Sequence, residues 1–319
     1  MFKLLCRFIQ FLFDGCISNG QNSILINSNF LLMTFIIISI FLFALNNVLW
    51  KKNLENCSVS FLVAFRASFT SLGSLSIFLY INGFNAFQYQ PLVRITLGSV
   101  FGAMGLFLML NVIKKAPLQL LGIYNLIGIV FSAFYLHFFE KISFINSAFG
   151  LSLILLGFVL YLIKNNNKKN VTSIKRIQHF YLLLMTLSFS ISSLIHWKNL
   201  NIKIPALYII ANQELVVFIF ALFILIRKSN LPEVKLGIKK YFTKTLVMAT
   251  IIFFALLFSF LGLQVTNPLI SSVLFLATPL LTFVFGKLFF KEKMNLYNLI
   301  AVVLIALGAF ILHYQIQMI

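Results

Sequence analysis

Two charged side chains lie inside stretches that are otherwise apolar, and they are the first candidates for chemistry. Arg66 lies about two turns into an apolar segment over residues 59–81, and Glu214 lies at a comparable depth in a segment over 204–226. A charge inside a membrane-spanning helix costs roughly 2.5–3.5 kcal/mol or more, so each is a functional-site hypothesis. A guanidinium can hold a carboxylate or phosphate with two hydrogen bonds, and a desolvated carboxylate can carry a coupling proton or hold an amine. Together the two groups would suit a zwitterionic solute.

A structural role for these two residues is the alternative. Arg66 lies close enough to a segment end for its long side chain to reach the lipid head groups. Glu214 could then pair with Arg66 as a structural lock. The residue types leave both interpretations open.

Several other residues within the apolar segments are candidates for a pathway or a moving part. Gly128 and Pro279 interrupt apolar segments and predict helix distortions that let part of the protein move. Trp50 and Trp197 stand beside lysines at segment ends, which favours interfacial anchors. Amide side chains line a polar pathway or bond across helices, where each bond is worth around 1 kcal/mol; they are Asn46, Asn47, Asn125, Asn212 and Gln213.

Composition requires that these residues be carried by membrane-spanning helices. The chain is 61% hydrophobic and 10% charged, with a mean hydropathy of +1.01. A span needs about 20 apolar residues to cross a core of roughly 30 Å. The longest polar connections are predicted over 164–177 and 227–242. Ten spans are predicted, over residues 30–50, 59–81, 92–113, 116–138, 143–163, 178–197, 204–226, 243–263, 268–290 and 294–314.

The two halves of the chain repeat. Trp50-Lys51 recurs as Trp197-Lys198, an offset of 147 that places Arg66 opposite Gln213. Five spans in each half is an odd number, so the second half must enter the membrane from the opposite side. Inverted repeats of this kind are typical of secondary transporters, with the substrate site at the repeat interface. At an offset of 151, Pro117, Gly128 and Gly157 match Pro268, Pro279 and Gly308.

The fold class predicted from these patterns is an all-α polytopic membrane protein with ten transmembrane helices in two inverted five-helix repeats. The predicted organisation is a polar tail over 1–29, a first repeat over 30–163, a basic linker over 164–177, a second repeat over 178–314 and a short tail over 315–319.

The second half also carries a recognisable pattern. The segment Ala277-Thr278-Pro279, followed by Glu292 and Gly308, resembles the EamA repeat of the drug/metabolite transporter superfamily. The stretch Phe61–Leu75, with Arg66 early in its helix, is similar to the same pattern, and the resemblance covers roughly residues 33–314. It implies a secondary transporter of a small organic solute, with export of an amino acid or related metabolite as the first expectation.

Two rival functions remain open at this stage. A non-transporting membrane scaffold or accessory protein would need neither Arg66, nor Glu214, nor a polar cavity. A carrier of phosphorylated or nucleotide-linked sugars should present a cluster of cations to its cavity, and Arg66 is the cation that the spans offer.

The net charge of +19 does not indicate a nucleic-acid partner. The lysines lie in short loops between spans, where the positive-inside rule places them. Their distribution favours both termini outside, whereas the family resemblance implies both termini inside. The partners expected are a small-molecule solute, membrane lipids and, as the candidate coupling ion, protons, in a multi-pass protein of the plasma (inner) membrane that is a monomer or a homodimer. The sequence shows no nucleophile motif, phosphate-binding loop or metal-ligand spacing, so we expect neither an enzyme nor a cofactor.

Overall fold

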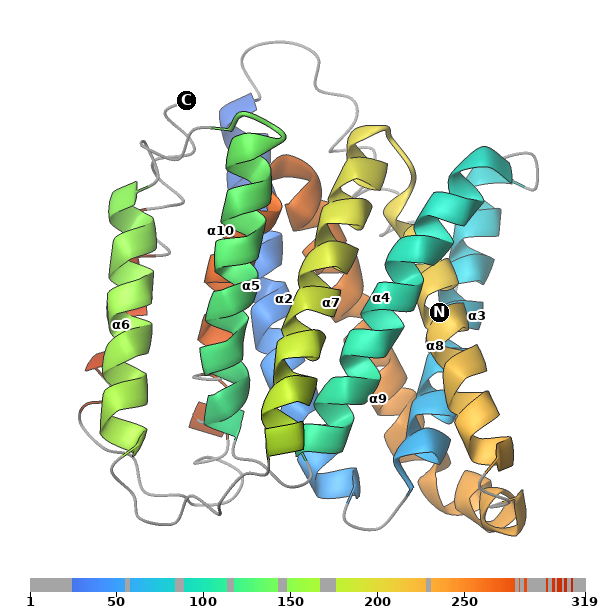
Figure 1. The fold of residues 1–319 in the computed structure, drawn as a ribbon. Coiled ribbons are helices and arrows are strands. Elements are labelled where there is room, and N and C mark those ends of the chain that lie inside the picture. Colours follow the sequence, from blue (N-terminus) through green and yellow to red (C-terminus); the bar gives the residue numbers. More distant parts are fainter. Residues whose placement is uncertain are drawn as a thin grey trace.

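The computed structural model describes residues 25–54, 58–83, 89–113, 118–142, 148–166, 176–227 and 231–278, together with single positions between 281 and 311. The described part is a bundle of helices (Figure 1). Its helices are α2 (Leu25–Leu54), α3 (Val59–Asn82), α4 (Tyr89–Ile113), α5 (Leu118–Phe138), α6 (Ala148–Asn166), α7 (Arg176–Asn201), α8 (Ala206–Arg227), α9 (Leu231–Val265) and α10 (Pro268–Phe275).

Several helices have the length and composition of membrane spans. Within the described residues, five segments of at least 22 residues qualify, and 22 residues of helix extend about 33 Å. Large apolar side chains point outward from the bundle, among them Val93, Val130 and Phe223, each more than 60% exposed. An apolar outer surface suits lipid rather than water. The five segments are Val59–Asn82, Pro91–Val112, Ile177–Asn201, Ala206–Arg227 and Tyr241–Val265.

Helices that are far apart in the sequence pack in pairs. The main contacts join α3 to α8, α4 to α7 and α2 to α9, while α4 also contacts α8 and α3 also contacts α9. The α4–α7 pair runs antiparallel and close, because glycines of α4 meet larger side chains of α7. A Cβ added to Gly98 would lie 2.8 Å from His196 Cε1, and one added to Gly105 would lie 2.8 Å from Phe189 Cδ1. Ser192 Oγ donates a hydrogen bond of 2.8 Å to the Gly98 carbonyl oxygen in the same interface.

Helix α6 meets described positions near the end of the chain through a reciprocal contact. A Cβ on Gly157 would lie 3.0 Å from the Ala301 carbonyl oxygen and from Ile305 Cγ1. A Cβ on Gly308 would lie 2.9 Å from the Gly150 carbonyl oxygen and 2.7 Å from Ile154 Cγ1. The offset of 151 relates each residue of the first contact to one of the second: Gly157 to Gly308, Gly150 to Ala301 and Ile154 to Ile305.

Helix boundaries differ from the sequence prediction at two main places. The predicted polar loop over 227–242 is wrong from Leu231 onward, since α9 begins there. Lysine and glutamate are good helix formers, and Pro232 lies in the first turn, where proline is tolerated. Helix α2 begins at Leu25 rather than near residue 30.

The start and end of α10 follow from local chemistry. Asn267 caps the helix by accepting a hydrogen bond of 3.0 Å from the Ile270 backbone, and Pro268 occupies the first turn. The helix ends at Phe275, two residues before the Ala277-Thr278-Pro279 segment where the sequence predicts a break. Pro279 itself and most of the predicted last span, 294–314, lie outside the described residues.

Candidate functional site

A central cavity of about 370 Å³ lies between the helices of the bundle. This volume is within the usual range of small-molecule sites. Its walls are largely apolar, with aromatic rings that include those of Phe43, Phe189 and Phe260. Six of the seven predicted binding or coupling candidates line it: Arg66, Glu214, Gln213, Asn46, Asn47 and Asn125.

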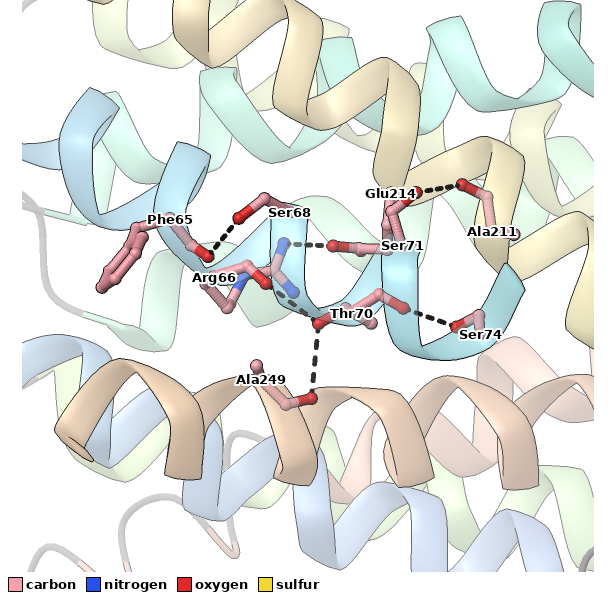
Figure 2. Close-up of polar contacts among 9 residues, drawn as sticks. All are labelled: Phe65, Arg66, Ser68, Thr70, Ser71, Ser74, Ala211, Glu214 and Ala249. Atoms are coloured by element: carbon pink, nitrogen blue, oxygen red, sulfur yellow. Dashed lines mark hydrogen bonds and ion pairs between the residues drawn. The ribbon is translucent and has the colours of Figure 1, made fainter. Parts of the chain in front are cut away.

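The two predicted charges meet in this cavity. Arg66 Nη2 on α3 lies 2.8 Å from Glu214 Oε2 on α8, and the two side chains are 2% and 4% exposed. Figure 2 shows Arg66 pointing from α3 toward α8, while α9 passes on the other side of α3. Because the guanidinium is buried inside the bundle, the prediction that Arg66 reaches the lipid head groups is wrong. The pairing of Arg66 with Glu214 that the sequence analysis considered is present.

Hydrogen bonds between helices hold this pair in place. Ser71 Oγ donates to the Ala211 carbonyl oxygen of α8 at 2.9 Å, and Thr70 Oγ1 donates to the Ala249 carbonyl oxygen of α9 at 3.3 Å (Figure 2). Thr70 also donates to the Arg66 carbonyl oxygen at 3.1 Å within α3. These bonds fix α3 between α8 and α9 at the level of the ion pair, so the position of Arg66 is set by the backbone around it.

The cavity contains buried polar atoms that have no hydrogen-bond partner among the described residues. Arg66 Nε and Nη1 are two of them, and the others include Asn46 Oδ1, Gln213 Oε1 and both ring nitrogens of His196. A buried polar group without a partner costs roughly 1–3 kcal/mol, so nearly all such groups in proteins are satisfied. Donors and acceptors are therefore both available to a polar ligand in the cavity.

Asn212 differs from its neighbours on α8. It does not line the cavity. Its Oδ1 accepts a hydrogen bond of 2.8 Å from Ser99 Oγ, and its Nδ2 donates one of 3.2 Å to Thr96 Oγ1. Both partners lie on α4, so Asn212 joins two helices rather than facing the cavity.

Gly128 lies on α5 and lines the cavity. The helix continues past Gly128 without a break. A Cβ there would lie 2.5 Å from Ser190 Oγ and 2.8 Å from Thr186 Cγ2 of α7. The glycine therefore permits a close approach of two helices, and its predicted role as a hinge stays a prediction. Pro279, the second predicted hinge, is outside the described residues.

Sequence reasoning missed part of the cavity wall. Trp50 and Trp197 were predicted as interfacial anchors, and this is wrong for both, since they are 2% and 9% exposed. Trp50 lines the cavity, and Trp197 Nε1 donates to the Thr266 carbonyl oxygen at 3.1 Å. His196 also lines the cavity and packs edge-on against Phe260, with ring centroids 5.4 Å apart. A signal for this wall was present in the polar spacing of α7, where Thr186, Ser190 and Ser193 recur every three to four residues.

The fold and the site define a class: a multi-pass helical membrane protein whose bundle encloses a largely apolar cavity with a few buried polar and charged side chains. The EamA-like transporter family model matches residues 176–314. The second half of this chain is therefore similar to the EamA-like transporter family, which is part of the drug/metabolite transporter superfamily, and this match supports a membrane transporter of that type.

Other comparisons bear on the fold alone. Among solved structures, 27 chains match. One, described only as "Crystal structure of protein", is 17% identical, covers 88% of this chain and 95% of its own length, and has a TM-score of 0.64. The search of curated proteins found no match.

Proposed function

We propose that this protein is a secondary transporter that moves a small organic solute through the central cavity by alternating access. The observation that carries the proposal is the buried Arg66–Glu214 pair, because it lines the cavity while Arg66 Nε and Nη1 lack a partner in the described part of the chain. A guanidinium with free N–H groups in an apolar cavity is suited to an anionic group of a solute. Glu214 then becomes available for the amine of that solute or for a coupling proton.

The charge balance of the cavity favours a zwitterionic solute. The ion pair is neutral overall, so a solute with a net charge would leave an uncompensated charge in a low-dielectric cavity, which is costly. An amino acid or related metabolite brings one carboxylate and one amine, which match Arg66 and Glu214 respectively. Export, proton coupling and residence in the plasma membrane complete the proposal.

The packing of the helices supports a design of ten spans in two inverted five-helix repeats. In such a design α2, α3 and α4 of the first half correspond to α7, α8 and α9 of the second. Exchanging the halves would therefore turn the α4–α7 contact into the α9–α2 contact, and the α4–α8 contact into the α9–α3 contact. All four contacts occur. The helix pair α3–α8 would exchange with itself and is also in contact. The reciprocal contacts of Gly157 and Gly308 follow the same relation at the far side of the bundle. In transporters built with such a symmetry, the solute site typically lies at the interface of the halves.

Counterflow in proteoliposomes tests the proposal directly. Proteoliposomes that contain the purified wild-type protein would be loaded with unlabelled compounds from a panel of amino acids and related metabolites. Entry of the same compound in labelled form would then be followed at several pH values. We expect at least one zwitterion to exchange, with an apparent affinity that falls at least tenfold in Arg66→Lys, because lysine keeps the charge but loses the planar fork. Arg227→Lys, at the exposed end of α8, is the matched control.

Glu214→Gln tests the coupling role, with Glu140→Gln as the control because Glu140 pairs with Lys198 outside the cavity. If Glu214 carries the proton, the pH dependence of transport disappears in Glu214→Gln and persists in Glu140→Gln. Wild-type protein that is folded and inserted, yet exchanges nothing in the panel, would contradict the proposal.

A further inference from the structure

A second hollow is lined by residues of α4, α5 and α7. In Figure 1, α7 lies between α5 and α4. The hollow has a volume of about 300 Å³ and shares no lining residue with the central cavity. Its walls include Leu97 of α4 and Ile191 and Ile195 of α7, and its polar lining residues are Arg94, Tyr135 and Lys198. Arg94 lies near the start of α4, and Lys198 lies near the end of α7. Because those two helices are antiparallel, the two cations share one end of the groove, and the apolar walls run inward from them.

The two cations that line the groove, Arg94 and Lys198, exceed the one carboxylate paired with them, Glu140, by one positive charge. Lys198 Nζ lies 2.6 Å from Glu140 Oε1 and 5.2 Å from the centroid of the Tyr135 ring, so its position is fixed and its charge is largely compensated. Arg94 is half-buried. It takes part in neither of the ion pairs formed among the described residues. Its guanidinium is therefore available to an anion at the membrane boundary.

We propose that this groove binds an anionic phospholipid, with the phosphate at Arg94 and Lys198 and one acyl chain along Leu97, Ile191 and Ile195. The apolar wall faces the bilayer, since Leu97 is 52% exposed on a helix of membrane-spanning length. Basic pockets between transmembrane helices are known sites for phospholipid head groups. The hydrogen bond from a guanidinium to a phosphate is charge-assisted and geometrically specific.

The groove shares no lining residue with the solute cavity, but the two are lined by opposite sides of the same helix, α7. Ile191 and Ile195 of α7 face the groove, whereas Ser192 and His196 of the same helix line the cavity. A lipid in the groove would therefore rest against the helix that forms a wall of the cavity.

Native mass spectrometry of the full-length protein in a neutral detergent tests the proposal. The probes are phosphatidylglycerol, phosphatidylcholine and diacylglycerol with the same acyl chains, which separate the effects of net charge, phosphate and acyl chain. We expect phosphatidylglycerol to bind most tightly. One basic residue near an anionic lipid contributes about fivefold in affinity, so Arg94→Gln should weaken phosphatidylglycerol binding by about that factor. Arg227→Gln, an exposed arginine at the end of α8, should leave it unchanged.

A second variant tests the acyl-chain part. Leu97→Trp replaces a half-exposed aliphatic side chain with a bulky indole ring that fills part of the groove. It should therefore weaken the binding of phosphatidylglycerol and diacylglycerol alike. The temperature of thermal unfolding in lipid-free detergent should stay at the wild-type value. Equal binding of phosphatidylglycerol and phosphatidylcholine by the wild type would overturn the proposal. Equal losses in Arg94→Gln and Arg227→Gln would do the same, as would unchanged lipid binding in Leu97→Trp.

Discussion

A double-mutant cycle on the buried Arg66–Glu214 ion pair distinguishes a role in transport from a purely structural role. Glu214→Gln leaves the Arg66 guanidinium buried without a counter-charge, and Arg66→Met leaves the Glu214 carboxylate in the same situation. Both side chains are at most 4% exposed, so water cannot screen the remaining charge. Breaking a buried pair by removing one partner costs about 3–5 kcal/mol, whereas replacing both partners is often nearly neutral.

Stability should therefore recover in the double variant. We expect each single variant to unfold at a clearly lower temperature than the wild type, and Arg66→Met combined with Glu214→Gln to regain most of the loss. Thermal unfolding in detergent measures this part. The coupling free energy obtained from the cycle should be about 6 kcal/mol or more in magnitude, since each single change costs about 3–5 kcal/mol and the double change is nearly neutral.

Transport should not recover with stability. The double variant has lost both the guanidinium for the solute and the carboxylate for the proton, so counterflow should stay at the background of empty liposomes. If the double variant regains transport together with stability, Arg66 and Glu214 are a structural lock and the proposed binding role is refuted. A single variant that unfolds like the wild type would refute the burial argument itself.

Three further predictions concern contacts between helices. Gly128→Ala places a Cβ 2.5 Å from Ser190 Oγ, so overpacking should lower the stability by about 1–3 kcal/mol. Adding Ser190→Ala should restore part of the lost stability, as measured by thermal unfolding. An equal loss with and without Ser190→Ala would count against the contact. Gly308→Ala should destabilise the protein similarly, because backbone atoms lie within 3 Å of the added Cβ. Gly73→Ala is the control, since its added Cβ has nothing within 4 Å, and it should stabilise the protein by about 0.5–1 kcal/mol. A loss of stability in both variants would show that helix packing is not the cause. Asn212→Leu should lower stability by about 1 kcal/mol and leave the apparent solute affinity unchanged in counterflow, and a changed affinity would place Asn212 in the site.

The sequence by itself determined that the chain crosses a membrane and which charges lie inside its apolar segments. Long apolar segments must span a bilayer, and a charge within them is so costly that Arg66 and Glu214 stood out without any structure. The offset of 147 even placed them at the same depth, because Gln213 and Glu214 are adjacent. Depth along a helix can be predicted from residue number, since the rise per residue is constant.

Only the tertiary structure decided which side of each helix faces the cavity. Lipid and protein core are both apolar, so the hydrophobic pattern of a membrane helix does not distinguish its faces as it does in a soluble protein. Asn212 and Gln213 are neighbours of the same chemical type, yet about 100° of helix rotation separates the one that bonds α4 from the one that lines the cavity. The burial of Trp50 beside the cavity, the open ring nitrogens of His196 and the distance of 2.8 Å between Arg66 and Glu214 all depend on how distant helices pack.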